Sequence, residues 1–168
     1  MSINTDYSFF EDYSFFSATK KQIESLKLPN NFLSFEINES EIADHREQFK
    51  TIVKQLSNMG IVMAVDQYTG RYLSPKAISD IGFHEIKLSR SLLKNIDNDR
   101  QRFEDIKYLM LDVKNNGMKN AVVGVENIDQ YLLIKEIDST TLIQGYYFYH
   151  PLEKQNLIDT LRLVNKTF

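Results

Sequence analysis

The sequence of 168 residues has no cysteine and no tryptophan, and only three prolines. The lack of cysteine excludes disulfide frameworks and thiolate zinc sites. A formal net charge of −3, from 20 Lys and Arg against 23 Asp and Glu, argues against a broad nucleic-acid surface. No apolar run approaches the roughly 20 residues that cross a bilayer, and residues 1–10 show no secretory signal pattern. We therefore expect a cytoplasmic protein that binds neither nucleic acid nor membranes.

The residue types that the chain does contain support one folded domain over residues 1–168. Apolar residues make up 42% of the chain and aromatic residues 12%, which is enough for a core. No Pro- or Gly-rich linker divides the chain. The segment Asp6–Phe10 is repeated as Asp12–Phe16 (Asp-Tyr-Ser-Phe-Phe). A period of six is too short for a solenoid, so we expect these aromatic side chains to pack at one end of a helix.

The rest of the chain alternates between short apolar runs and amphipathic stretches. Residues 32–36 predict a strand, Ser40 can cap the following helix, and Gly60 can end it. The apolar run 61–65 is typical of a strand that is covered on both faces in a parallel sheet. Further strands are predicted at 83–88, 120–125 and 141–146, with helices around 103–113 and 157–164. Repeated strand–helix units indicate an α/β fold with a parallel sheet, either open or closed into a barrel.

Polar side chains stand at or just after the predicted strand ends. They are Glu36, Glu39, Asp66, Lys87, Glu126 and Gln144. Ligands of α/β proteins bind at the carboxyl ends of the strands, so these residues predict a site, although any single acid could be a helix cap. Oxygen ligands of this kind suit Mg²⁺ or Mn²⁺ rather than zinc. By contrast, His45, His84 and His150 are scattered, and no glycine-rich phosphate loop or nucleophile elbow is present.

Five ordered segments surround these residues. They are Phe-Leu-Ser-Phe-Glu-Ile-Asn-Glu-Ser (32–40), Gly-Ile-Val-Met-Ala-Val-Asp-Gln-Tyr-Thr-Gly (60–70), Glu-Ile-Lys-Leu-Ser (85–89), Val-Gly-Val-Glu-Asn (123–127) and Gln-Gly-Tyr-Tyr-Phe-Tyr-His-Pro-Leu (144–152). Together these segments resemble the EAL domain, the fold of bacterial cyclic-di-GMP phosphodiesterases. In the family these segments read LxxElTEs, Gly-…-Asp-Asp-Phe-Gly-Thr-Gly, IKiD, EGVET and QGYxFxxPL. Residues 1–4 also resemble a family strand, vNxS.

The resemblance implies a (β/α)8 TIM-barrel-like fold with a divalent-metal site on its carboxyl face. It assigns metal binding to Asn4, Glu36 and Asp66. Lys87 matches the lysine that orients the attacking water, and Glu39 matches the acid that steadies the loop after Asp66. Glu126 matches a further catalytic position, whereas Gln144 and Pro151 match positions that line the ligand site.

Departures from the family pattern are as informative as the matches. The Glu-Ala-Leu segment, with its metal-binding Glu and nearby Arg, should lie before residue 1, together with about the first two strand–helix units. We therefore expect an incomplete barrel of about six units. Gln67, Val123 and Ser89 replace acidic residues of the family, and Arg71 replaces a glycine. Two-metal hydrolysis needs such carboxylates to hold the ions and ionise a water, so we expect catalysis to be lost.

The expected function is a degenerate, inactive member of the family that acts by binding. We expect no cofactor, or Mg²⁺ or Mn²⁺ if the site is retained. The expected partner is a transcription regulator or another signalling protein, with weak binding of cyclic-di-GMP. Open barrel edges predict a homo-oligomer, with Phe9, Phe10, Phe15 and Phe16 in the contact. The alternatives are an active phosphodiesterase or a cyclic-di-GMP sensor whose N-terminal part is supplied elsewhere, and a gene remnant without a selected role.

Overall fold

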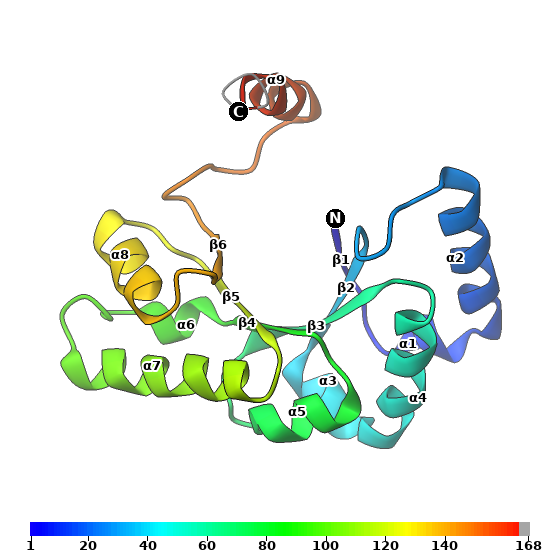
Figure 1. The fold of residues 1–168 in the computed structure, drawn as a ribbon, viewed down its shortest axis with the longest axis horizontal. Coiled ribbons are helices and arrows are strands. Elements are labelled where there is room, and N and C mark those ends of the chain that lie inside the picture. Colours follow the sequence, from blue (N-terminus) through cyan, green and yellow to red (C-terminus); the bar gives the residue numbers. More distant parts are fainter. Residues whose placement is uncertain (165–168) are drawn as a thin grey trace.

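A computed structural model describes residues 1–164, except the side chains of Tyr13, Leu163 and Val164. One parallel sheet of six strands runs in sequence order from β1 to β6 (Figure 1). The strands are β1 (Ser2–Asn4), β2 (Ser34–Asn38), β3 (Val62–Tyr68), β4 (Glu85–Leu88), β5 (Lys119–Val123) and β6 (Leu142–Gln144). The sheet curves into a half-barrel, which confirms the predicted α/β class and the incomplete barrel of six strands.

Helices cover the outer, convex side of this sheet, whereas the concave side faces the opening in Figure 1. They are α1 (Ser8–Glu11), α2 (Tyr13–Leu26), α3 (Glu39–Asp44), α4 (Arg46–Ser57), α5 (Pro75–Ile81), α6 (Arg90–Leu93), α7 (Arg100–Asn115) and α8 (Ile128–Ile137). The last helix, α9 (Lys154–Val164), lies apart from the sheet on the side of the opening. Among residues 1–164, no helix combines the length and the apolarity that a membrane crossing requires.

The two faces of the sheet differ in chemistry because side chains alternate along each strand. Phe35, Met63, Val65 and Ile86 are buried between the sheet and the helices, where the main core lies. The concave face carries small or polar residues instead. Register pairs on this face are Asn4 with Glu36, Glu36 with Ala64, Ala64 with Glu85, and Lys87 with Ala121. Closed barrels of this type fill the interior with bulky branched residues, whereas Glu36, Ala64 and Ala121 on this face are acidic or small and are themselves buried.

The region after β2 departs from the predicted helix. β2 runs to Asn38, so Glu36 lies within the strand rather than at its end, and the helix begins at Glu39 without a cap from Ser40. His45 leaves helical geometry, with φ −124° and ψ 35°, and separates α3 from α4. Its ring stacks on Tyr7 at 3.7 Å between ring centroids, which ties this break to the N-terminal segment. Asp66 likewise lies within β3, which ends at Tyr68.

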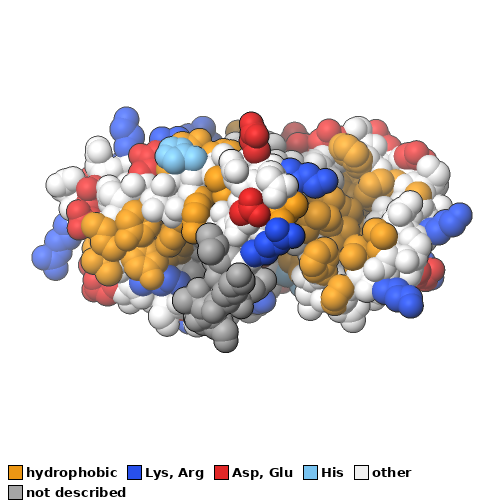
Figure 2. Space-filling model, turned by 90° about the horizontal axis from the view of Figure 1, so that it is seen from above, with side chains coloured by type: hydrophobic (Ala, Val, Ile, Leu, Met, Phe, Trp, Pro, Cys, Tyr) orange, Lys and Arg blue, Asp and Glu red, His pale blue; other side chains and the backbone are white. Residues whose placement is uncertain are grey.

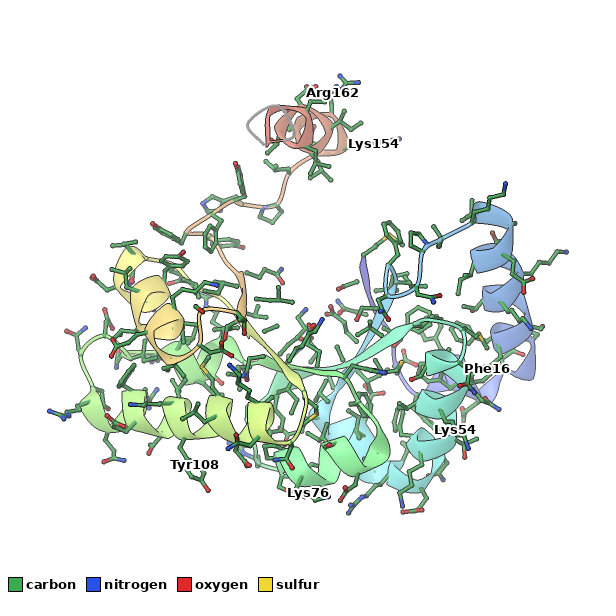
Figure 3. The ribbon with its side chains drawn as sticks, in the orientation of Figure 1. Phe16, Lys54, Lys76, Tyr108, Lys154 and Arg162 are labelled. Atoms are coloured by element: carbon green, nitrogen blue, oxygen red, sulfur yellow. The ribbon has the colours of Figure 1, made fainter. Side chains whose placement is uncertain are left out.

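The repeated Asp-Tyr-Ser-Phe-Phe segments form the starts of two consecutive helices, and the second helix has Asp12 as its N-cap. The Asp6 carboxylate accepts a hydrogen bond from the Ser8 N–H at 2.9 Å, and Asp12 accepts one from the Ser14 N–H at 2.8 Å. Such bonds satisfy helix N–H groups that lack an intrahelical partner. Phe10 lies in the core, and Phe15 and Phe16 pack against it. Figure 3 shows Phe16 where α2 faces α4.

The two phenylalanines of the first copy have opposite surroundings. Phe10 is 7% exposed and packs against Phe35 and Phe49, whereas Phe9 is 47% exposed. The prediction that Phe10 takes part in an intersubunit contact is therefore wrong, because this side chain belongs to the chain's own core.

The Phe9 and Phe10 pair offers a matched test of this packing. Phe10→Ala should lower the free energy of unfolding by about 3–5 kcal/mol, because it leaves a cavity in the core. Phe9→Ala should change it by less than about 0.5 kcal/mol. Urea unfolding followed by circular dichroism measures both values, and equal effects of the two substitutions would contradict this assignment of core and surface.

Candidate functional site

Glu36, Asp66 and Lys87, here called the acid–lysine cluster, meet on the concave face towards the carboxyl ends of β2, β3 and β4. The Lys87 Nζ atom lies 2.5 Å from Oε2 of Glu36 and 3.9 Å from Oδ1 of Asp66. The three side chains are 12%, 5% and 21% exposed for Lys87, Glu36 and Asp66. Asn4 is the register partner of Glu36 on β1. The structure thus brings together the residues for which the sequence predicted metal and water binding.

The composition of this cluster does not fit a two-metal centre. In residues 1–164 no group of three or more His, Cys, Asp or Glu side chains is placed to hold a metal ion. The Lys87 ammonium already neutralises Glu36, so a cation would compete with it for the same carboxylate. Gln67, which follows Asp66, supplies a neutral amide and is exposed, with a left-handed φ of 50°. Two carboxylates and amides give too little negative charge for two divalent ions.

Glu39 lies beneath the loop that follows β3. Its carboxylate accepts hydrogen bonds from the backbone N–H groups of Thr69, Tyr72 and Leu73 and from the Thr69 hydroxyl, at 2.9–3.1 Å. The buried Tyr68 hydroxyl donates to the Leu73 carbonyl at 2.8 Å. Burial raises the pKa of Tyr68, and the negative charges of Glu39 and Asp112 raise it further. These contacts hold residues 69–73 in one conformation.

Glu85 lies on the same concave face as the acid–lysine cluster, one layer deeper in the half-barrel. Burial raises the pKa of its carboxyl group, and the charge of Glu36 adds to this rise. Lys87 and Lys119 act in the opposite direction. Lys87 thus compensates acidic charge from three strands, through Glu36 on β2, Asp66 on β3 and Glu85 on β4.

A second group of polar residues lines a cavity of about 460 Å³ beside β5 and β6, here called the β5–β6 cavity. Its lining residues are Arg90, Val123, Gly124, Glu126, Gln144, Gly145, Tyr146, Tyr149, His150 and Pro151. Arg90 and Glu126 form an ion pair across it. The predicted positions Glu126, Gln144 and Pro151 are therefore brought together here, apart from the contacts of the acid–lysine cluster.

Two glycines shape this cavity. A Cβ atom on Gly124, which has φ +85°, would lie 2.5 Å from Cγ of Arg90, and one on Gly145 would lie 2.0 Å from the Val125 carbonyl oxygen. Glycine is thus required at both positions for the observed packing. Gly124 lets the Arg90 side chain lie across the backbone, from where its guanidinium reaches Glu126.

Reasoning from the sequence missed Arg90, Tyr146 and Tyr149, and it treated His150 as scattered. Arg90 directly follows Ser89 at the end of β4, so its position at a strand end was the available signal.

The three positions at which this chain replaces an acidic residue of the family have different surroundings. Gln67 is exposed, Val123 lines the β5–β6 cavity, and the Ser89 hydroxyl accepts from the Ser91 N–H at 3.3 Å at the start of α6.

A curved parallel sheet with helices outside and polar side chains at its carboxyl edge defines a (β/α)-barrel domain with a site on that edge. Residues 1–151 match the EAL domain family, and the chain belongs to this family.

Relatives and solved structures agree with this assignment. The Pseudomonas aeruginosa protein "Cyclic di-GMP phosphodiesterase RocR" is 25% identical over 132 residues, which are 79% of this chain and 33% of RocR. The EAL domain of Mycobacterium smegmatis DcpA superposes with a TM-score of 0.85 at 18% identity, over 96% of this chain and 72% of that chain. The P. aeruginosa FimX EAL domain, solved with cyclic-di-GMP bound, gives a TM-score of 0.82 at 20% identity, over 89% of this chain and 61% of that chain. Other curated relatives are matched over about a fifth of their length.

The Lys87–Glu36 ion pair can be tested by a double-mutant cycle. Lys87→Met should lower the free energy of unfolding by about 3–5 kcal/mol, because it leaves the Glu36 carboxylate buried without its counter-ion. Adding Glu36→Gln should recover much of this loss, so the double variant should be more stable than Lys87→Met alone. Lys76→Met, at an exposed position on α5, is the control and should have little effect. Additive effects of the two cluster substitutions would show that the pair is not coupled.

Proposed function

We propose that this protein is a catalytically inactive EAL-type module that regulates cyclic-di-GMP-linked signalling through protein contacts. The observation that carries the proposal is the 2.5 Å ion pair between Lys87 and Glu36. The resemblance to EAL domains assigns to Lys87 the role of orienting a water and to Glu36 the role of binding a metal ion. A metal ion at Glu36 would therefore have to compete with the Lys87 ammonium for the same carboxylate.

The replaced positions support the loss of catalysis independently of this ion pair. Gln67 and Val123 stand where the family has acids, and a partner that supplied further residues would restore neither carboxylate. A side chain that transfers a proton in the transition state contributes typically 10²–10⁴-fold to a rate. A valine can neither hold a metal ion nor transfer a proton, so both losses act on the chemical step.

Nucleotide binding is a weaker part of the proposal. FimX and RocR connect the family with cyclic-di-GMP, and the β5–β6 cavity offers Tyr146, Tyr149 and Gln144 to a ligand. However, the cation lining this cavity, Arg90, is already neutralised by Glu126. A phosphate group would have to displace that carboxylate, so binding should be weak.

Protein contact is favoured by the amount of apolar surface that this fold leaves open. Exposed apolar side chains follow β6 and continue onto α8, namely Tyr146, Tyr147, Phe148, Tyr149, Leu152, Ile128 and Leu132. Contiguous apolar surface of this kind marks interaction sites. A transcription regulator or another signalling protein is the partner that we propose. The same surface favours weak homo-oligomers of the isolated chain.

The second candidate is an active cyclic-di-GMP phosphodiesterase, or a sensor, completed by a segment outside residues 1–168. The observation in its favour is that Asn4, Glu36, Asp66 and Lys87 still share the concave face. A gene remnant without a selected role would not need to keep these four side chains together on one face.

Hydrolysis separates the two candidates. With Mg²⁺ or Mn²⁺ present, the purified 168-residue chain should leave cyclic-di-GMP intact, because the Gln67 and Val123 positions lack carboxylates. Chromatography of the nucleotide over several hours measures this, with RocR as the active control. Linear dinucleotide that no longer forms with the Asp66→Asn variant would establish the active enzyme instead.

Calorimetric titration decides the question of nucleotide sensing. The resemblance assigns further charged contacts to a segment outside this chain. Each charged hydrogen bond contributes about 1.5–3 kcal/mol, so two missing contacts should weaken cyclic-di-GMP binding by roughly 10²–10⁴-fold. We expect weak or undetectable heat, unchanged by Arg90→Ala. Submicromolar binding that Arg90→Ala abolishes would favour a sensor.

A further inference from the structure

A second pocket lies on the helix side of the Arg90–Glu126 ion pair, between the segments that follow β4 and β5. Its volume is about 480 Å³, and it is here called the α6–α8 pocket. Both strands have a neighbour on each side in the sheet, so the pocket is bounded by parts of the fold that are complete in this chain. It shares Arg90, Gly124 and Glu126 with the β5–β6 cavity, and its other lining residues are Ser91, Leu93, Lys94 and Gln130.

The side-chain amide of Gln130 is only half used by the fold. Gln130 is 8% exposed, and its Oε1 atom accepts a hydrogen bond from the Glu126 N–H at 2.8 Å. Because a backbone N–H can only donate, this contact fixes which end of the amide is the oxygen. The Nε2 group at the other end has no acceptor among residues 1–164.

This Nε2 group is not enclosed by protein either. In the described part of the chain, the enclosed side-chain atoms that lack a hydrogen-bond partner are Asn120 Oδ1 and Thr141 Oγ1. Gln130 is therefore a buried side chain that presents an unused donor to the α6–α8 pocket, which it lines.

Two cationic side chains extend this set of donors. The Lys94 ammonium has no carboxylate partner among residues 1–164, whereas Arg90 is paired with Glu126. The lining thus carries two positive charges and one negative charge. Gln130 lies in the first turn of α8, so the positive end of that helix dipole also points to this region. The pocket favours a negatively charged ligand.

The donors suit an oxyanion with several oxygens. Ammonium, guanidinium and amide N–H groups approach from different residues, and a tetrahedral phosphate group offers an acceptor to each of them. The volume falls in the range of roughly 300–1,000 Å³ that is usual for small-molecule sites. The pocket therefore has room for the remainder of a small phosphorylated molecule.

The surface charge as a whole does not account for such binding. In the view of Figure 2, Lys and Arg side chains are spread around the molecule among acidic and apolar ones, and the described residues form no continuous basic patch on that face. The formal net charge is −3. Binding of an anion by this chain thus requires donors that converge in one place, as they do in the α6–α8 pocket.

We infer that the α6–α8 pocket binds a phosphate group, either as inorganic phosphate or as part of a small phosphate monoester. Lys94 and the Nε2 group of Gln130 donate to the phosphate oxygens, and Arg90, which Glu126 partly neutralises, adds positive charge. This site is separate from the acid–lysine cluster, and it does not depend on the proposed inactivity or on the proposed protein contact.

The test is a titration of the full 168-residue chain, labelled with nitrogen-15, at constant ionic strength in a buffer without phosphate. Inorganic phosphate should cause saturable NMR shifts of the Gln130 side-chain amide and of the Lys94 and Glu126 backbone N–H groups. Glycerol phosphate in a parallel titration distinguishes the two sources. Tighter binding than inorganic phosphate assigns the pocket to phosphate monoesters, and equal or weaker binding assigns it to the free ion.

Substitutions in the pocket should change the affinity in opposite directions. Lys94→Met and Gln130→Glu should each weaken phosphate binding about tenfold or more, because each removes a donor. Gln130→Glu keeps the oxygen that accepts from the Glu126 N–H. Glu126→Gln should strengthen binding instead, since Arg90 loses its competing carboxylate. Lys54→Met is the control, because Figure 3 shows Lys54 on α4, far from α8, and it should leave the affinity unchanged.

The inference is overturned by the absence of saturable shifts, or by equal shifts with sodium chloride at the same ionic strength. It is also overturned if Lys94→Met weakens binding no more than Lys54→Met does, or if Glu126→Gln weakens it. Well-dispersed NMR spectra show that each variant is folded. If Gln130→Glu does not fold, Lys94→Met and Glu126→Gln still carry the test through their opposite effects.

Discussion

A parallel sheet has to bury the face that its crossover helices cover, and this requirement determines most of the structure. Phe35, Met63, Val65 and Ile86 project towards the helices and are buried there. Strict alternation then places Glu36, Asp66, Glu85 and Lys87 on the other face. The charges are consequently confined to one concave surface, where Lys87 has to balance several acids. The polar site is a direct result of how the core is built.

The sequence predicted the order of the elements and the class of fold because both depend on local patterns. Continuous apolar runs such as 61–65 are typical of strands in parallel sheets, and amphipathic spacing marked α4 and α7. Strand ends were less predictable. β2 and β3 extend past Glu36 and Asp66, since pairing with neighbouring strands continues where the local pattern already looks like a loop. The break at His45 depends on Tyr7, which is 38 positions away in sequence, and no local pattern contains that contact.

The candidate site was predicted residue by residue, but its division into two groups was not. Position at a strand end is a local property, whereas the pairing of Lys87 with Glu36 and of Arg90 with Glu126 depends on which strands are neighbours. Arg90 was missed for this reason. Its role becomes visible only when Gly124, 34 positions later, is seen to leave room for its side chain.

The duplicated segment near the N-terminus shows how a chain can lengthen without losing order. Each copy contains its own aspartate and serine, so each starts a helix with a hydrogen bond made inside the copy. In the first copy Phe10 is buried in the core and Tyr7 packs partly against it, whereas Phe9 remains exposed. A segment that contains the residues needed to begin a helix adds a helix rather than an irregular loop. The repeat therefore adds ordered helix at this end of the chain.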